Sequence, residues 1–441
     1  MTQTGQSSSS GPKIRPCPVC ASTGPREVLH RQEFFEGPLG DGYDVAVCGN
    51  CGAGFADGIP TQAELDRYYA ERSKYTYAHA GGEESPYDFK RFELIADQLA
   101  RHLPSREARI LDIGCATGGL LAVLKKRGYR HVLGSDPAPA CSAAALRLHG
   151  IEVRTAALAD HATWTDRFDV VLLVGVLEHL REVRPAVQTV AGLLRPKGLL
   201  YCAQPDVEAF ADCENAPYQQ FSTEHVNYFS RDSLTRLMAV AGLQPHETWR
   251  WMVEWRAGIT DSVVSGVFGK EQGAGSKEPG GGLHRRGLEG AENERRQPSL
   301  VSGRSSPDGP SRDEVTAPAL RQYLARAVAQ EAAALRQIAE LVRTQEPVLI
   351  WGAGTLTRRL LATTALGRAN IVAFVDSNPA FGGQTLAGRS ILPPTGLTGR
   401  SEKILIGSRV FAVEIVRAIR EQFRLPNQVI TLSTGPFFNR G

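Results

Sequence analysis

Apolar positions recur with two different periods between residues 107 and 205. Short apolar runs suit buried strands, and the stretches between them have the spacing of amphipathic helices. The predicted strands are Arg109–Ile113, Val132–Ser135, Val153–Ala156, Val170–Val174 and Gly198–Ala203. This alternation predicts an α/β fold with a parallel sheet that is covered on both faces.

Helical periodicity flanks this region. Residues 60–102 are expected to be mostly helical, and another helix is expected to begin at Ser230 and end before Gly242. A long helix follows at about 315–345, and then a second alternation starts. Its predicted strands are Val348–Trp351, Ile371–Val375 and Lys403–Ile406. The chain is therefore expected to carry two Rossmann-like units.

Composition marks the boundaries between these units. Residues 269–312 are rich in Gly, Ser, Pro, Glu and Arg, and with few large apolar side chains they cannot offset the entropy cost of ordering. The expected organisation is a disordered tail at 1–11, a cysteine-containing module with a connecting helix at 12–80, the first α/β domain at 81–250, a connecting segment at 251–268, a disordered linker at 269–312, and a helix with the second α/β domain at 313–441.

Charge and hydropathy exclude some partners. The 441 residues include 50 basic and 47 acidic ones, so the balance gives no argument for binding nucleic acid or an anionic membrane. No apolar run is long enough to span a bilayer, and the N-terminus lacks the apolar core of a secretory signal. We therefore expect a cytoplasmic protein without disulfides.

Four of the eight cysteines form two C-x-x-C pairs, Cys17/Cys20 and Cys48/Cys51. Two such turns can bring four thiolates into the tetrahedron that Zn²⁺ prefers, and a site filled by four cysteines is structural because it leaves no place for substrate. The alternative is a redox C-x-x-C, which usually lies at a helix N-terminus after a strand. The paired motifs in one segment favour zinc.

A glycine motif follows the first predicted strand of the central domain. Asp112 comes two residues before Gly114, and Gly118 comes just before a predicted helix. The glycines allow a sharp turn and a close approach to a ligand. The spacing D-x-G-x-x-x-G differs from the dinucleotide fingerprint, and the carboxylate disfavours phosphate but suits a cation. S-adenosylmethionine (SAM) carries an ammonium and a sulfonium.

Two further positions complete the expected cofactor site. Asp136 ends the next strand, where a carboxylate can accept both ribose hydroxyls, and Leu158 follows the third strand, where it can line an adenine slot. Together with Asp112 and Gly114, these residues resemble the class I SAM-dependent methyltransferases over about residues 87–245. The alternative is a Rossmann-like domain that binds NAD or no ligand.

Candidate acid–base residues lie at the expected carboxyl edge of the sheet. His179 follows the fourth strand, and adjacent Glu224 and His225 lie just before the helix at Ser230. Histidine titrates near neutrality, which suits proton transfer. The alternative for each histidine is a packing or capping role.

The whole arrangement resembles the sugar C-methyltransferases of deoxysugar biosynthesis. The resemblance rests on the four cysteines, on Asp112-x-Gly114, and on the motifs that run from Glu224 to Ser230 and from Phe374 to Pro379. It implies an enzyme that acts on a nucleotide-linked keto-sugar. The enzyme would consist of a zinc domain, a SAM domain and a C-terminal Rossmann-like domain.

The resemblance also implies residue roles. His225 is the base that removes a proton next to the ketone, Glu224 is its partner, and Tyr75 or Tyr77 closes the pocket. The chain departs from the family at Ser222 and Thr223, where the family has Tyr-His. That departure favours a second hypothesis, O- or N-methylation of a glycan, lipid or secondary metabolite. A third hypothesis is an inactive binding or scaffold protein.

The C-terminal domain carries half of a nucleotide-binding fingerprint. Gly352-Ala353-Gly354 follows a strand, and Asp376 ends the next one. By resemblance this unit helps to hold the nucleotide of the substrate, and the alternative is a degenerate unit that only packs.

Overall fold

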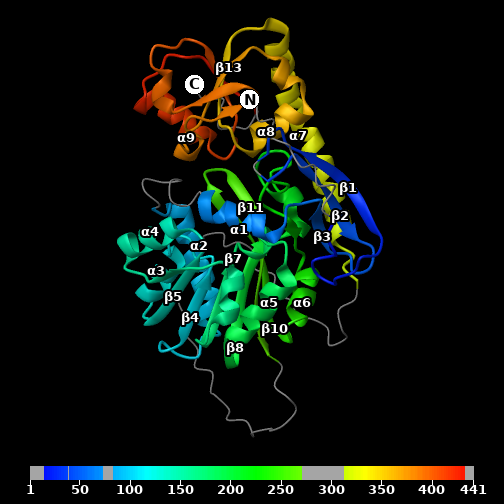
Figure 1. Cartoon of the computed structure of the whole chain (residues 1–441), viewed down its shortest axis with the longest axis vertical. Coiled ribbons are helices and arrows are strands. Elements are labelled where there is room, and N and C mark those ends of the chain that lie inside the picture. Colours follow the sequence, from blue (N-terminus) through cyan, green and yellow to red (C-terminus); the bar gives the residue numbers. More distant parts are fainter. Residues whose placement is uncertain (1–13, 38, 73–82, 271–311, 433–441) are drawn as a thin grey trace, which may run out of the picture.

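The computed structural model describes residues 14–37, 39–72, 83–270 and 312–432. The strands form three sheets, and Figure 1 shows the N-terminal sheet in blue beside the central cyan and green domain, with the C-terminal domain in orange and red. Within these ranges no helix has both the length and the apolar character to cross a bilayer. The expected tail at 1–11 and residues 271–311 of the expected linker lie outside the described residues.

The central sheet has seven strands in the order β10-β11-β8-β7-β4-β5-β6. These are β4 (Arg109–Ile113), β5 (His131–Asp136), β6 (Val153–Thr155), β7 (Phe168–Val174), β8 (Leu194–Pro205), β10 (Leu243–Arg256) and β11 (Ile259–Lys270). Strands β8, β7, β4, β5 and β6 are parallel, whereas β10 and β11 add an antiparallel edge. The predicted α/β fold is confirmed, and each of the five strands predicted for this domain is present.

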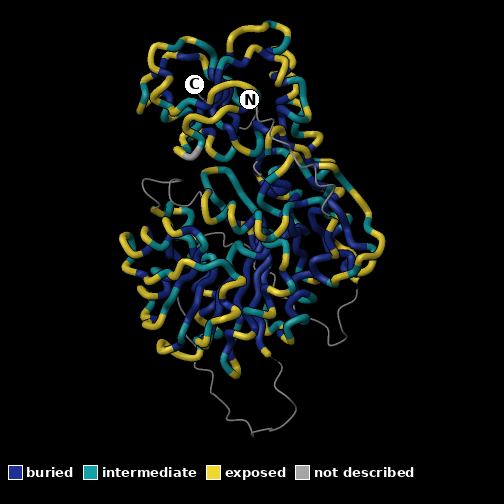
Figure 2. The backbone as a smooth tube through the Cα atoms, viewed as in Figure 1, coloured by how far each residue is buried: buried dark blue, intermediate teal, exposed yellow. Residues whose placement is uncertain are grey.

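Helices cover both faces of this sheet. They are α2 (Pro86–Ala100), α3 (Gly119–Lys126), α4 (Pro139–His149), α5 (Val183–Leu193) and α6 (Arg231–Ala239). Ile110 and Leu172 pack with α2 and α3, whereas their neighbours Leu111 and Leu173 pack with α5 and α6. Successive side chains of a strand point to opposite faces, so buried strands need apolar residues at every position. Figure 2 shows this buried centre in dark blue.

The structure corrects the expected connecting segment at 251–268. These residues belong to β10 and β11, which pair with each other and attach to β8. Trp249, Trp251 and Val253 alternate along β10 and are all buried. The period of two is that of a strand with one face on the core, so the methyltransferase-like domain extends beyond residue 250.

The N-terminal sheet consists of β1 (Arg26–Glu33), β2 (Gly42–Cys48), β3 (Gly54–Asp57) and β9 (Asn227–Tyr228), in that order. Helix α1 (Gln62–Arg72) follows β3. The strand β9 comes from the segment just after Glu224 and His225, and it pairs antiparallel with β3. The expected 12–80 module is therefore completed by two residues of the central domain.

The C-terminal domain is joined to the N-terminal sheet by α7 (Thr316–Thr344). Leu320 and Tyr323 pack with the N-terminal sheet, whereas Ile338 and Leu341 pack in the C-terminal core. The C-terminal sheet has the order β14-β15-β13-β12-β16-β17. Its elements are β12 (Val348–Trp351), α8 (Thr355–Thr363), β13 (Ile371–Val375), β14 (Thr385–Leu386), β15 (Arg389–Leu392), β16 (Lys403–Ile406), α9 (Ala412–Arg417) and β17 (Val429–Thr431).

The β10–β11 hairpin gives a test of the corrected boundary. Phe268 on β11 has 0% exposure, so Phe268→Ala should lower the free energy of unfolding by about 3–5 kcal/mol, through lost burial and a new cavity. Met252 is 37% exposed on β10, so Met252→Ala is the matched control and should have little effect. Urea unfolding of both variants checks this. A neutral Phe268→Ala would mean that 251–268 contributes nothing to the core.

Candidate active site and metal centre

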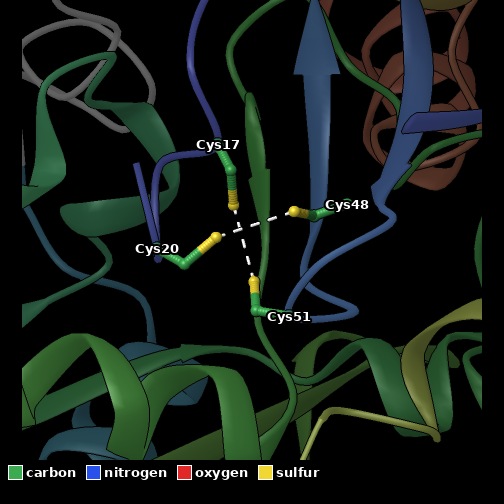
Figure 3. A group of neighbouring side chains, drawn as sticks. All are labelled: Cys17, Cys20, Cys48 and Cys51. Carbon is green, nitrogen blue, oxygen red and sulfur yellow. Dashed lines mark hydrogen bonds between the residues drawn. The ribbon is translucent and has the colours of Figure 1, made fainter. Parts of the chain in front are cut away.

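The four cysteines of the two C-x-x-C turns converge on one point, as Figure 3 shows. The Sγ atoms of Cys17 and Cys51 are 3.6 Å apart, and those of Cys20 and Cys48 are 3.7 Å apart. Four thiolates around a zinc ion with Zn–S bonds of about 2.3 Å would be separated by about 3.8 Å. All four cysteines are free thiols. The donor set and its spacing therefore fit a closed zinc site.

The Cys48–Cys51 turn of this cluster packs against Asp313, just before α7. Gly52 has φ +82°, and a Cβ there would lie 1.9 Å from the carbonyl oxygen of Asp313. The amide of Asp313 donates to Cys51 O, and Ser230 Oγ donates to the Asp313 carboxylate at 2.5 Å. The cysteine cluster is thus built into the junction of all three domains.

The glycine loop after β4 adopts the shape that its sequence predicts. Gly114 has φ +74°, and a Cβ there would lie 2.7 Å from Val176 Cγ2, so only glycine fits. Asp136 at the end of β5 accepts from the amide of Ala116 at 3.0 Å and from that of Ala138 at 2.9 Å. These bonds hold the Asp136 carboxylate at the tip of the loop, beside the left-handed Gly118 that precedes α3.

Acidic side chains are concentrated at this loop. Asp112 is buried on β4, and burial, with the charge of Asp136 as a second cause, raises the pKa of Asp112 to about 8. Burial also raises the pKa of Asp136. Leu158 begins the short 3₁₀ helix η2 (Leu158–Thr163) and packs against the core on the α5 side. Strands β4, β5 and β6 are adjacent, which brings these three residues to one edge of the sheet.

A further acidic group at this loop was not predicted from the sequence. Glu84 precedes α2, and its side chain is only 7% exposed. It accepts from Thr117 Oγ1 at 2.7 Å, and its other oxygen is 2.9 Å from His149 Nε2. A lone glutamate in a polar stretch gives no sequence signal, because its position depends on the packing of α2 against α3.

The predicted acid–base residues lie together. His179 ends the short helix η3 (Leu177–His179), and its ring centroid is 5.0 Å from that of His225. His179 Nδ1 is 3.1 Å from Glu224 O. One donor atom each of Glu178, His179 and His225 lies within 4.8 Å of the others. The two histidines and Glu224 therefore form one cluster, although 45 residues separate His179 from Glu224 in the chain.

The backbone of this cluster is fixed on both sides. Ser222 Oγ accepts from the amides of Glu224 and His225 at 3.2 and 3.1 Å. The amide of Val226 donates to Glu178 O at 2.7 Å. Ser222, which departs from the resembled family, therefore shapes the turn that presents His225.

Two tyrosines of α1 reach the cluster. The Tyr68 hydroxyl donates to Glu224 Oε1 at 3.0 Å, and the Tyr69 hydroxyl is 2.9 Å from His179 Nδ1. Neither Tyr68 nor Tyr69 was predicted as a site residue from the sequence. The predicted tyrosines Tyr75 and Tyr77 lie outside the described residues.

A cavity of about 460 Å³ lies between α7 and the C-terminal domain. Arg336, Arg359 and Arg409 line it together with one acidic residue, Glu331. Arg359 pairs with Glu331 at 2.5 Å, and burial lowers the pKa of Arg409. Pro217 lines the same cavity and belongs to the segment that continues to the His225 cluster. The charge of the lining suits an anionic ligand.

The glycine loop of the C-terminal domain has a different environment. Asp376 accepts from the amides of Ala353 and Asn378, both at 2.8 Å. Arg358 on α8 is buried and donates to Ala353 O at 2.9 Å, and its guanidinium also reaches Glu36 O in the N-terminal module. This loop therefore takes part in domain packing, and the cavity begins beside it, at Leu356, Ile406 and Ser408.

Comparisons with known proteins agree with the central domain. A family model described as a methyltransferase domain matches residues 87–248. A ubiquinone biosynthesis O-methyltransferase of Cereibacter sphaeroides is 35% identical over 208 residues, which cover 40% of this chain and 83% of that protein. Its counterpart in Xylella fastidiosa is 33% identical over 147 residues, covering 32% of this chain and 58% of that protein.

Among solved structures, the N-methyltransferase NodS of Bradyrhizobium japonicum has 16% identity and a TM-score of 0.34, covering 48% of this chain and 98% of that one. The fold and glycine loop define the central unit as a Rossmann-like methyltransferase domain. With the relatives, they show that the chain belongs to the class I SAM-dependent methyltransferases, and is an enzyme that uses SAM.

The cysteine cluster predicts a measurable metal content. We expect about one zinc per chain, because four converging thiolates form a closed tetrahedral site. Cys48→Ser should lower the zinc content and unfold the N-terminal module, since metal binding and folding are coupled in such units. Cys213→Ser changes another buried cysteine outside the cluster and should keep the zinc. Full zinc occupancy in a Cys17→Ser/Cys48→Ser double variant would rule out this site.

The raised pKa of Asp112 predicts that SAM affinity depends on pH. With a pKa of about 8, most Asp112 is protonated below neutrality. A bound cation favours the ionised carboxylate, so binding releases a proton and affinity should rise with pH. We expect a rise of up to about tenfold per unit between pH 5.5 and 7, below the range in which the SAM amino group titrates. Isothermal titration of wild type and Asp112→Asn checks this, since the variant should lose most of the slope.

Proposed function

We propose that this methyltransferase transfers a methyl group to carbon in a nucleotide-linked keto-sugar, with His225 as the base. The observation that carries the proposal is the cluster at the carboxyl edge of the sheet. It joins His225 and Glu224 to His179 and to Tyr68. A carbon nucleophile needs a positioned base, because a proton must first leave carbon.

The residues of the cluster take distinct roles. The His225 imidazole accepts the proton from the carbon next to the ketone, and the electron pair of that C–H bond moves into an enolate. SAM, when bound, supplies the methyl group that this carbon accepts. The new C–C bond forms as the methyl–sulfur bond breaks, which leaves S-adenosylhomocysteine. His225 then returns its proton to solvent, and Tyr68 keeps Glu224 in place through their hydrogen bond.

The cofactor end of the site suits this placement. Asp112, Asp136 and Glu84 surround the glycine loop with carboxyl groups, and in their ionised form these complement the ammonium and sulfonium of SAM. We assign Asp136 to the ribose hydroxyls and Leu158 to the adenine. Gly114 and Gly118 allow the backbone to approach the cofactor.

The nucleotide of the acceptor fits the arginine-lined cavity. Three guanidinium groups face one carboxylate there, and guanidinium groups bind phosphate oxygens in bidentate geometry. Pro217 in the cavity wall and His225 in the cluster lie in one continuous segment. We therefore assign the diphosphate to this cavity and the sugar to the His225 side. The four-cysteine site is proposed to hold a structural zinc.

O-methylation is the second candidate. The Cereibacter and Xylella relatives are named as O-methyltransferases. Ser222 and Thr223 also stand where the resembled sugar enzymes have Tyr-His. A hydroxyl acceptor already carries a lone pair, so it needs less help from a base.

Isotope exchange distinguishes the two candidates. When the wild type is incubated in D₂O with a panel of nucleotide-linked keto-sugars, the carbon next to the ketone should incorporate deuterium, because His225 removes the proton of that carbon before methyl transfer. His225→Ala should lower turnover by about 10²–10⁴-fold while SAM affinity holds. His131→Ala, at an exposed histidine paired with Glu107, is the control and should leave turnover unchanged. Labelled SAM then locates the methyl group on carbon.

A different set of results would favour O-methylation. Methyl transfer to oxygen without deuterium uptake, together with a nearly active His225→Ala, would contradict C-methylation and support the second candidate.

A further inference from the structure

Arg15 is buried between the N-terminal module and the central domain, with 2% exposure. Its Nε donates to Ala56 O at 3.0 Å, and its Nη1 donates to Arg181 O at 3.0 Å. Its Nη2 donates to Val226 O at 2.6 Å and to Asn227 Oδ1 at 2.8 Å. One guanidinium thus binds four acceptors on three segments of the chain.

Two of those segments carry the candidate catalytic residues. Val226 directly follows His225, and Arg181 lies two residues after His179. The side-chain amide of Asn227 donates hydrogen bonds to Leu177 O and Leu180 O, both at 2.7 Å. Arg15 therefore closes a network that sets the distance between the two histidine segments.

Residues close to the two cysteine turns also fix the position of Arg15. Arg15 lies two residues before Cys17, and its backbone amide donates to Asp57 Oδ1 at 3.0 Å. Its guanidinium is 5.4 Å from the centroid of the Phe55 ring. Phe55 belongs to β3, which continues from the Cys48–Cys51 turn. A metal that joins the two cysteine pairs would fix the backbone on both sides of this arginine.

We propose that Arg15 is a positioning residue, which couples metal occupancy of the four-cysteine site to the geometry of the Glu224–His225 segment. This inference rests on the proposed placement of catalysis at His225. It gives the metal site of the N-terminal module a role in the reaction, in addition to the contact that Tyr68 of the same module makes with Glu224.

Hydrogen exchange of the full-length protein tests the coupling without any acceptor substrate. Arg15→Lys keeps the positive charge but lacks the planar guanidinium with its several donors, and Arg15→Gln removes both the charge and the guanidinium. Both variants should speed exchange of the Val226 amide by at least about tenfold, because its hydrogen bond to Glu178 O is then less constrained. Zinc content and SAM affinity should hold in Arg15→Lys.

Arg31→Gln is the matched control. Arg31 lies on β1 of the same module, is half exposed and pairs with Asp44 at 3.2 Å. Arg31→Gln should leave the exchange of Val226 unchanged.

Zinc removal completes the test. Chelation of wild type should speed exchange of residues 222–229, whereas the same treatment should add little in Arg15→Gln, because the connecting residue is already lost. Turnover on the acceptor that the keto-sugar panel identifies should fall by about 10- to 100-fold in Arg15→Lys. The fall should be in kcat, because small displacements at a reacting centre have effects of that size.

The outcomes separate the two proposals. Unchanged Val226 exchange in Arg15→Lys, or an equal change in Arg31→Gln, overturns the coupling. Faster exchange with full turnover keeps the coupling but contradicts the placement of catalysis at His225. If Arg15→Gln does not fold, Arg15→Lys and the chelation of wild type still decide the question.

Discussion

The antiparallel pairing of β9 with β3 is the constraint on which the site depends. Gly54 pairs with Tyr228 and Phe55 pairs with Asn227. This short ladder fixes the chain two residues after His225 against the strand that follows the second cysteine turn. A loop of the central domain is thereby held by a neighbouring module, and its side chains reach the carboxyl edge of the sheet in a defined orientation.

The electrostatics of the site follow from burial. Near the glycine loop, Asp112 and Asp136 are buried, and Asp136 accepts hydrogen bonds from two backbone amides and from the Cys141 thiol. Buried carboxylates that lack a paired cation prefer to be protonated, which is the direction of the raised pKa values. A cationic cofactor reverses that preference. The arginine-lined cavity has a basic lining instead, so the two sites would favour ligands of opposite charge.

Periodicity and turn chemistry predicted most of the fold, because buried parallel strands require continuous apolar runs and glycine loops require specific residues. The β10–β11 hairpin was not predicted, although Trp249, Trp251 and Val253 alternate along β10, because its pairing with β8 is a tertiary contact that a local pattern does not show. The Glu224–His225 pair was predicted from its residue types and its place before the helix at Ser230, and its roles were predicted from the family resemblance. Its partners Tyr68, Tyr69 and Arg15 could not be predicted, because each reaches its contact through tertiary pairing of distant segments.

The two Rossmann-like units show how one local geometry can serve two purposes. Asp136 and Asp376 each accept two backbone amides, one from the glycine loop and one from the residue two positions further on. After Gly114 the loop faces acidic side chains that suit a cationic ligand. In the C-terminal unit, Arg358 lies against Ala353 O and continues into the N-terminal module. The part of the geometry that both units share is thus the carboxylate that stabilises the turn, whereas the charges near each loop come from the segments that pack over it.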